Sequence, residues 1–158
     1  MPVQAYTPVN GRILSITTSA EDCCQKQLAL LTDNGPVNLL LTPDTYVVNS
    51  MRLRVGMQIT AFYDSSLPVP LVYPPQYRPV IITGHRANEM VTVNWFDPEL
   101  LAADASLQLN LAPSTEVVSA NGQPFTCSPG NHNLIVYYTS TTRSLPPQTT
   151  PRKIIVLC

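Results

Sequence analysis

A proline pattern that occurs twice constrains the fold of this chain more than any other feature. The pattern Pro-Pro-Gln-x-x-Pro occupies residues 74–79 and, 72 residues later, residues 146–151. Each copy is followed at once or after two residues by an apolar run, at residues 80–82 and 154–156. Because self-similarity at a fixed spacing is the signature of repeated structural units, the chain is expected to contain an internal repeat.

Two further matches lie upstream of the proline patterns. Residues 41–48, Leu-Thr-Pro-Asp-Thr-Tyr-Val-Val, match residues 111–118, Leu-Ala-Pro-Ser-Thr-Glu-Val-Val, at an offset of 70. Gly56 matches Gly130 at an offset of 74. Three matches in the same order and at nearly the same spacing predict two tandem copies of one unit.

The predicted units are residues 1–85 and residues 86–158, the second a degenerate copy of the first. Runs of β-branched and aromatic residues bounded by glycine and proline are typical of short strands. Five strands are expected in the first unit, at residues 11–17, 27–32, 37–41, 58–63 and 80–83. The turn at residues 33–36, Asp-Asn-Gly-Pro, joins the second strand to the third.

The second unit shows fewer strand signals at its start. Residues 90–96 are expected to correspond to the second strand of the first unit, with the opening strand missing or merged with residues 80–83. The two units would then share an edge. Residues 98–105 are the best helical candidate, because Asp97 would be the N-cap and proline the first helical residue. Later strands are expected at residues 107–111, 133–138 and 153–157.

Five short strands per unit, with a glycine turn before the fourth, predict an all-β fold of two small, partly open barrels of the OB type. Residues 11–83, which include Gly56–Asp64 and Leu71–Tyr77, resemble a repeat in small proteins of unknown function from Gram-positive bacteria. The resemblance implies an OB-like β-barrel and brings no catalytic residues. It also implies export, since many such proteins are exported.

Composition and charge limit the classes of partner. Apolar residues make up 44% of the chain and charged residues only 12%, which argues against disorder. With so little charge, either a partner or a second copy shields part of the apolar surface, or Ser, Thr, Asn and Gln cover it. The net charge is −1 and the basic residues are scattered. Nucleic acid is therefore a disfavoured partner, because its binding depends on phosphate neutralisation.

The sequence has no run of about 18 apolar residues that would predict a membrane-spanning helix. Its N-terminus, Met-Pro-Val-Gln-Ala-Tyr, lacks the basic start and the apolar middle of a signal peptide. The chain as written is predicted to be soluble and cytoplasmic, or exported if a leader has been removed.

Nothing in the sequence predicts catalysis or a cofactor. Common nucleophile, zinc, phosphate-loop and dinucleotide motifs are absent from the sequence. A thiolate-rich metal site around Cys127 and His132 is disfavoured, because the paired C-x2-C spacing of zinc sites is missing. Free thiols are expected at all four cysteines, Cys23, Cys24, Cys127 and Cys158, since two of them are adjacent and one is the last residue. We expect a protein that is not an enzyme.

Aromatic residues beside the prolines are the candidate binding residues: Tyr73, Gln76, Tyr77 and Trp95. The lead hypothesis is a non-enzymatic binding or scaffold module that recognises a protein, with a homo-oligomer as one form. The alternative is binding of single-stranded nucleic acid or an oligosaccharide through the aromatic face of the first barrel. A structural reading, in which Trp95 and Tyr63 fill the core, competes with both hypotheses. Tyr73 and Tyr77 have no counterparts in the second copy, which has Leu145 and Thr149 there.

Overall fold

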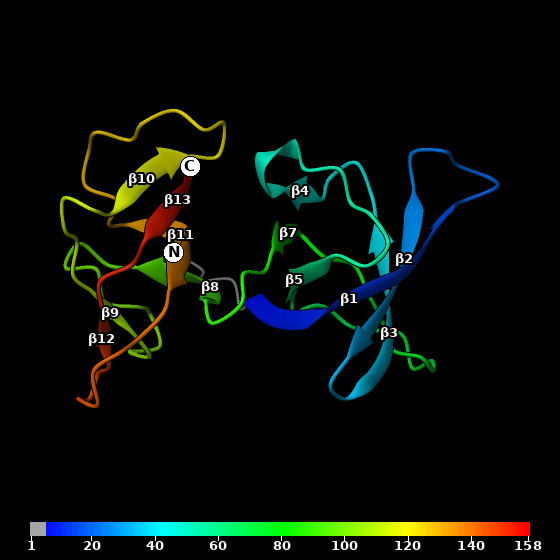
Figure 1. Ribbon diagram of the computed structural model, residues 1–158, viewed down its shortest axis with the longest axis horizontal. Coiled ribbons are helices and arrows are strands. Elements are labelled where there is room, and N and C mark those ends of the chain that lie inside the picture. The colour runs from blue at the N-terminus through cyan, green and yellow to red at the C-terminus, as the bar shows by residue number, and fades with distance from the viewer. Residues whose placement is uncertain (1–5) are drawn as a thin grey trace. The chain divides into compact units, whose positions relative to one another are not determined.

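A computed structural model describes residues 6–158, which divide into two compact units at residues 6–85 and 86–158 (Figure 1). Strands dominate both units, and the described residues contain no α-helix; the single 3-10 turn is η1 (Val48–Ser50). The predicted all-β class is confirmed. No helix within residues 6–158 has the length and the apolar character to cross a bilayer.

Seven strands form one mixed sheet in the first unit, in the order β4-β7-β5-β1-β2-β3-β6. They are β1 (Tyr6–Thr18), β2 (Lys26–Thr32), β3 (Gly35–Leu41), β4 (Tyr46–Val47), β5 (Gln58–Asp64), β6 (Gln76–Tyr77) and β7 (Ile81–Gly84). The pairs β3–β6 and β4–β7 are parallel and the others antiparallel. Because β4 and β6 end this order, the hydrogen bonds do not close the sheet into a barrel.

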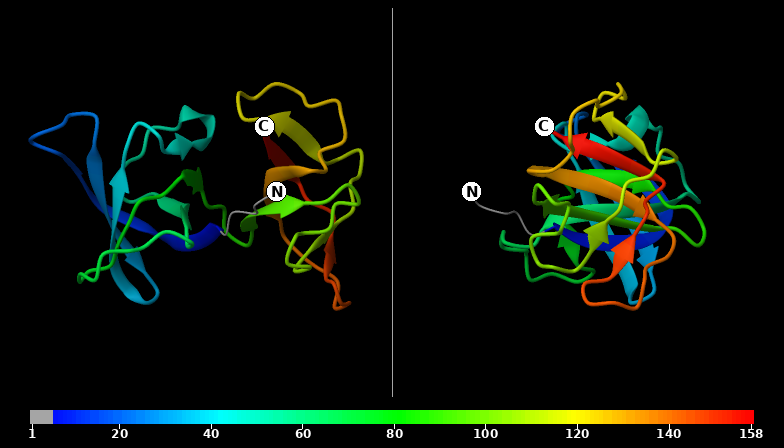
Figure 2. Two further views of the ribbon diagram at one scale, coloured as in Figure 1. Left: turned by 180° about the vertical axis from the view of Figure 1, so that it is seen from behind. Right: turned by 90° about the vertical axis from the view of Figure 1, so that its left-hand side faces the viewer.

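The long strand β1 joins the two halves of this sheet (Figures 1 and 2). Its first half pairs with β5 and its second half with β2. Gly11 lies where the pairing changes, and a Cβ there would lie 2.6 Å from the carbonyl oxygen of Leu31. Only glycine allows this close approach. Alternating residues of the hairpin then face the core, with Ile13, Leu28 and Leu30 completely buried.

The segment from β6 to β7 pairs with strands near both edges of the sheet. Its start pairs with β3 at Asn38 and Leu39, and its end pairs with β5 and β4. Pro79 lies between the two strands and is buried. Its carbonyl oxygen accepts a hydrogen bond from Thr45 Oγ1 at 3.0 Å, and the next residue's carbonyl accepts one from Tyr46 N at 2.9 Å. The proline thus interrupts the strand without leaving its carbonyl oxygen unpaired.

The second unit contains a four-stranded sheet, ordered β10-β13-β11-β8, and the two-stranded pair β12-β9. Its strands are β8 (Met90–Phe96), β9 (Gln108–Leu109), β10 (Glu116–Ser119), β11 (His132–Tyr138), β12 (Gln148–Thr149) and β13 (Lys153–Leu157). Phe96, Leu134 and Ile154 are completely buried in its core. Both β11 and β13 are buried over several consecutive residues, and alternate residues, Val136 beside Leu134 and Val156 beside Ile154, belong to this core.

The prediction that residues 90–96 correspond to the second strand of the first unit is wrong. Strand β8 pairs antiparallel with β11 along its whole length, as the first half of β1 pairs with β5. By its pairing, β8 therefore corresponds to the first strand of the first unit.

The helix predicted at residues 98–105 is also wrong. Asp97 Oδ1 does accept the backbone N–H groups of Glu99 and Leu101, at 2.9 and 3.0 Å, as an N-cap residue would. The chain then turns back, and Ala102 forms a bridge with Phe96. Leu101 bridges Gln108 on β9. Leu101 and Ala102 are therefore extended and pair with β8 on one side and β9 on the other. These pairings outweigh the helical propensity of so few residues.

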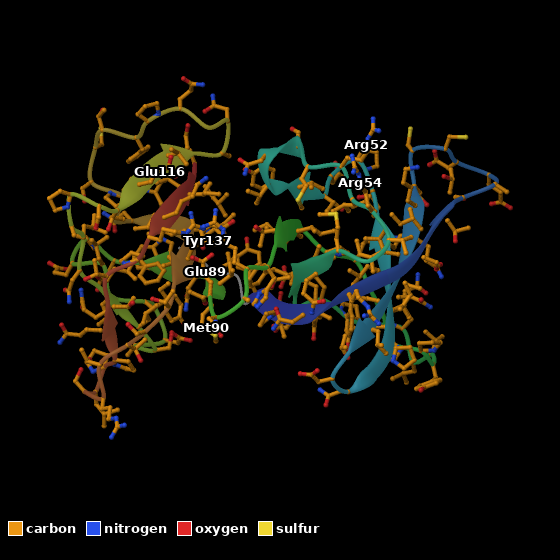
Figure 3. The ribbon with its side chains drawn as sticks, in the orientation of Figure 1. Arg52, Arg54, Glu89, Met90, Glu116 and Tyr137 are labelled. Carbon is orange, nitrogen blue, oxygen red and sulfur yellow. The ribbon has the colours of Figure 1, made fainter. Side chains whose placement is uncertain are left out.

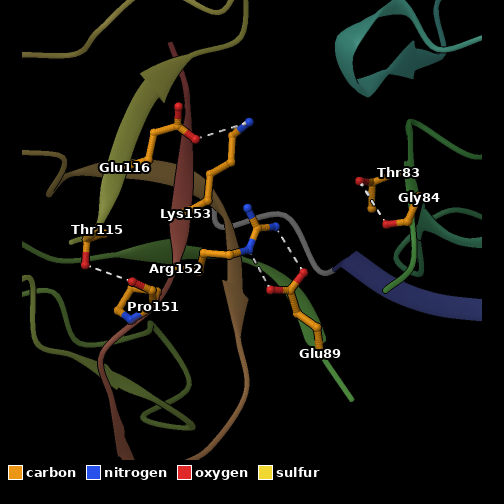
Figure 4. Close-up of polar contacts among 8 residues, drawn as sticks. All are labelled: Thr83, Gly84, Glu89, Thr115, Glu116, Pro151, Arg152 and Lys153. Carbon is orange, nitrogen blue, oxygen red and sulfur yellow. Dashed lines mark hydrogen bonds and ion pairs between the residues drawn. The ribbon is translucent and has the colours of Figure 1, made fainter. Parts of the chain in front are cut away.

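An ion pair joins the buried Glu89, just before β8, to the partly exposed Arg152, just before β13 (Figure 4). Figure 3 labels Glu89 and the nearby Tyr137. Glu89 is only 5% exposed and receives two hydrogen bonds from Arg152, at 2.8 and 3.1 Å. The guanidinium also lies over the ring of Tyr137, 5.3 Å from its centroid. The hydrogen bond to Glu89 raises the pKa of Arg152. This carboxylate and guanidinium fix each other in a fork geometry.

Candidate functional site

The first unit carries a pocket of about 400 Å³ between the end of β3, the neighbour of the edge strand β6, and the end of β5. Four segments line it: the end of β3 with the turn after it, the end of β5, the loop after β5, and the segment that joins β6 to β7. The lining residues are Leu40, Thr42, Asp44, Tyr63, Asp64, Leu67, Pro68, Val69, Pro70, Gln76, Tyr77, Arg78, Pro79 and Val80. A pocket of this size fits a few amino-acid side chains.

Two stacked tyrosines form the rigid part of the pocket wall. The ring centroids of Tyr63 and Tyr77 lie 4.2 Å apart with an angle of 16° between the planes. Each residue is held by a different pairing, since β5 pairs with β1 and β6 with β3. Burial, and then the neighbouring Tyr77, raise the pKa of Tyr63. The Tyr63 phenol therefore stays neutral at physiological pH and can donate or accept a hydrogen bond.

A strongly apolar loop adjoins the stack. We call residues 67–73 the apolar loop; its most exposed residues are Leu71, at 104% relative exposure, Tyr73 at 83% and Leu67 at 60%. Its start is fixed by Asp64 Oδ1, which accepts hydrogen bonds from Ser66 N and Ser66 Oγ. Soluble monomers rarely expose so many large apolar side chains in so short a stretch, and such patches usually mark an interaction surface.

Charged groups sit at the rim of the pocket. Asp44 and Arg78 are exposed and Asp64 is half-buried. Within residues 6–158 none of the three forms an ion pair with another side chain. Two carboxylates against one guanidinium give the rim a local excess of negative charge, which favours a ligand with a basic group over a phosphate.

The structure brings together only two of the four predicted binding residues. Gln76 and Tyr77 line the pocket. Tyr73 is 83% exposed and is not part of the lining. Trp95 lies in the other unit, half-buried on β8 opposite Asn133.

Sequence reasoning missed Tyr63, which it assigned to the core. It also missed Asp44 and Asp64, because isolated carboxylates read as solvated charge. A usable signal was the sequence Leu-Pro-Val-Pro at residues 67–70, an apolar loop with proline at alternate positions. Such a loop cannot form a central strand, so its apolar side chains are not expected to be buried in a sheet.

The second unit has a smaller pocket, of about 300 Å³, formed by corresponding segments. Gln148 and Thr149 of β12 line it, as Gln76 and Tyr77 of β6 line the first. The other lining residues are Asn110, Ser140, Thr141, Thr142 and Thr150. This wall contains only hydroxyl and amide side chains, and Asn110 Nδ2 donates to Gln148 Oε1 at 2.9 Å. The two pockets thus lie beside short strands with similar pairing, β6 and β12, but differ in chemistry.

The histidines and cysteines lie outside both pockets. His85 Nδ1 is 3.1 Å from Thr60 Oγ1, and His132 Nδ1 is 2.8 Å from the carbonyl oxygen of Gly130. All four cysteines are exposed and none is disulfide-bonded. Residues 6–158 contain no group of three or more His, Cys, Asp or Glu side chains placed to hold a metal ion.

No protein-family model matches the chain, and no curated protein matches it either.

Proposed function

We propose that this chain is a non-enzymatic binding module that recognises an apolar, proline-containing segment of a protein partner. The binding site is the pocket around Tyr63 and Tyr77. The observation that carries the proposal is the stacked tyrosine pair in a 400 Å³ pocket, with Pro68, Pro70 and Pro79 in its wall.

Proline-containing segments suit this pocket for a physical reason. They are extended before binding, so they lose little conformational entropy, and their rings pack on flat aromatic faces. The stack presents such faces without further ordering, because each tyrosine is fixed by its own strand pairing. The carboxylates of Asp44 and Asp64 would attract a basic residue beside the prolines.

We also propose that the two units are copies of one OB-like unit, as the sequence repeat and its resemblance to a bacterial repeat suggest. Three hydrogen bonds of the first unit have counterparts in the second. Thr45 Oγ1 donates to Pro79 O, as Thr115 Oγ1 donates to Pro151 O (Figure 4 shows the second bond). Tyr46 N donates to Val80 O, as Glu116 N donates to Arg152 O. Asn38 N donates to Pro75 O, as Gln108 N donates to Pro147 O. In this proposal the prolines and threonines that form these bonds belong to the shared structure of both copies, whereas the stacked Tyr63 and Tyr77 occur only in the first copy.

A second candidate is binding of single-stranded nucleic acid or an oligosaccharide, which the exposed ring of Tyr73 favours. The carboxylates at the rim repel a phosphate backbone, so nucleic acid is a less favoured ligand than a peptide. In this alternative the main platform would be Tyr73 outside the pocket, not Tyr77 inside it.

The proposal is tested by selecting ligands from a displayed library of random dodecapeptides, with the full chain as bait and the Tyr77→Thr variant for counter-selection. Threonine occupies the corresponding position, Thr149, in the second unit, so the fold should tolerate the change. We expect enriched peptides that contain apolar residues and proline beside a basic residue, and that bind Tyr77→Thr at least tenfold more weakly.

The matched control is Tyr73→Ser, which alters an exposed ring outside the pocket. Peptide binding should change less than twofold. Peptides without proline enrichment, or equal binding to wild type and Tyr77→Thr, would contradict the proposal. If the chain binds an oligothymidine in a salt-dependent manner and Tyr73→Ser abolishes that binding, nucleic-acid binding becomes the favoured function.

A further inference from the structure

We infer that the peptide segment taken by this pocket is supplied by a second copy of the chain, as the loop between β11 and β12. The inference rests on the proposed function of the pocket and names its occupant. The tip of this loop, residues 143–147, contains Arg143, Leu145, Pro146 and Pro147. In this arrangement the second unit of one molecule docks into the first unit of the next.

The loop exposes an apolar side chain that its own unit does not use. Leu145 is 96% exposed, although the burial of a leucine side chain is favourable. It directly precedes Pro146 and Pro147, so the tip has the composition that the pocket is proposed to bind. Figure 1 shows this loop, in orange, extending beyond the sheets of its unit.

Hydrogen bonds within the loop fix its shape in advance. The loop is closed at its base, where Thr142 N donates to the carbonyl oxygen of Gln148 at 2.8 Å and Gln148 N donates to Thr142 Oγ1 at 3.0 Å. At the tip, Ser144 Oγ donates to the carbonyl oxygen of Pro146 at 2.8 Å and contacts Thr142 Oγ1 at 2.6 Å. A loop that is already ordered loses little entropy on docking, so a small contact can give useful affinity.

Charge matches the loop to the pocket. Arg143 is exposed and forms no ion pair within residues 6–158. The pocket rim has the exposed Asp44 and the half-buried Asp64. Leu145 and the prolines would lie against the tyrosines and the apolar loop, while the guanidinium of Arg143 reaches the carboxylates.

This contact joins two different surfaces, so copies associate loop to pocket. The contact either closes, with each copy's loop in another copy's pocket, or continues as an open chain, and in both cases association increases with concentration. Contacts of this size are weak, so the assembly should be seen at high micromolar concentration and above.

Mixing two variants tests the inference. Tyr77→Thr removes the pocket and keeps the loop, whereas Leu145→Ser removes the loop and keeps the pocket. Sedimentation velocity of the wild-type full chain is expected to show association that grows with concentration. Each variant alone should be monomeric, and an equimolar mixture should form a one-to-one dimer and nothing longer, because only one productive loop and one productive pocket remain.

Two outcomes overturn the inference. One is a wild-type chain that stays monomeric up to millimolar concentration. The other is association that persists in Leu145→Ser and is lost in Leu71→Ser, which would mean that two apolar loops pack together. Binding of library-selected peptides to the pocket is measured on the same proteins. If peptides bind while the chain stays monomeric, the occupant is a different protein and the proposed function stands; if neither occurs, both fail.

Discussion

The two units have similar strand pairings, which we call the frame, and differ in their hairpins and pockets. In both units a proline-interrupted final segment pairs with three strands, and a threonine hydroxyl donates to a proline carbonyl oxygen of that segment. The first unit has a long hairpin, β1–β2, and a tyrosine-lined pocket. In the second unit β8 forms a single bridge, between Phe96 and Ala102, in place of such a hairpin, and the pocket beside β12 is lined with hydroxyls and amides. The same pairings are therefore compatible with very different loops.

The cores show how the second unit compensates for its short hairpin. By register, Ile13 of the first unit corresponds to Phe96 of the second, and their bridge partners are Leu30 and Ala102. All four residues are buried. A large residue beside a small one replaces two of medium size, so the space at the centre of the core is filled in both units.

The largest effect is expected from breaking this compensation. Phe96→Ala should destabilise the second unit by about 4 kcal/mol, because it removes a completely buried ring beside an alanine and leaves a cavity. The measurement is native-state hydrogen exchange of the β11 amides in the full chain. The double variant Phe96→Ile with Ala102→Leu, which copies the first unit, should recover more than half of that loss.

Exchange of the β5 amides serves as the control, since they belong to the first unit. A double variant no more stable than Phe96→Ile alone would show that the two positions are not coupled. The volume compensation inferred from the comparison would then be wrong.

The next largest effect concerns the ion pair between Glu89 and Arg152. The first unit has Val80 at the position of Arg152 and therefore cannot form this pair. Arg152→Met should destabilise the second unit by about 2 kcal/mol, because it removes the guanidinium that neutralises the buried carboxylate of Glu89. The cost stays below that of a fully buried pair, since the Arg152 side chain is 38% exposed and partly solvated.

Lys153→Met provides the matched control. Lys153 pairs with Glu116 at 3.6 Å, and the Glu116 side chain is 59% exposed, so this change should cost less than about 1 kcal/mol. Thermal unfolding and hydrogen exchange of the β13 amides measure both variants. Equal effects of the two substitutions would show that the burial of Glu89 does not set the strength of the pair.

The positions of the strands were more predictable from the sequence than their pairing or the pocket. Alternating runs bounded by proline and glycine located β2, β3, β5, β11 and β13 to within about two residues, because side-chain period and breakers act locally. Strand β8 was located but given the wrong place in the sheet, since pairing is a tertiary property. The predicted helix failed because Leu101 and Ala102 had sheet partners that no local pattern reveals.

The candidate site was only half predictable. Tyr77 could be found because it lies inside the repeated proline pattern at a position where the second copy has Thr149, whereas Gln76 was found as part of that pattern, which the second copy repeats as Gln148. Tyr63 could not, because it looked like any aromatic residue at the end of a strand. Only the register that places β5 and β6 on either side of the pocket brings its ring onto Tyr77.

The smallest effect should be the same in both units, which sharpens the idea of a shared frame. Thr45→Val and Thr115→Val keep the shape of the side chain but remove a hydroxyl that donates to a proline carbonyl, at 3.0 and 2.8 Å. The same hydroxyls accept the N–H groups of Thr42 and Ala112, at 3.2 and 3.3 Å. Each substitution should therefore cost its own unit about 1 kcal/mol and leave the other unit unchanged.

Native-state hydrogen exchange of the β7 and β13 amides distinguishes the units in one experiment. Equal losses would show that the anchor contributes equally to the two frames, although one carries a tyrosine-lined pocket and the other a polar one. A loss confined to Thr45→Val would mean that the second unit no longer depends on the anchor. The buried ion pair between Glu89 and Arg152 would then be its replacement, because Arg152 directly follows the proline whose carbonyl Thr115 binds.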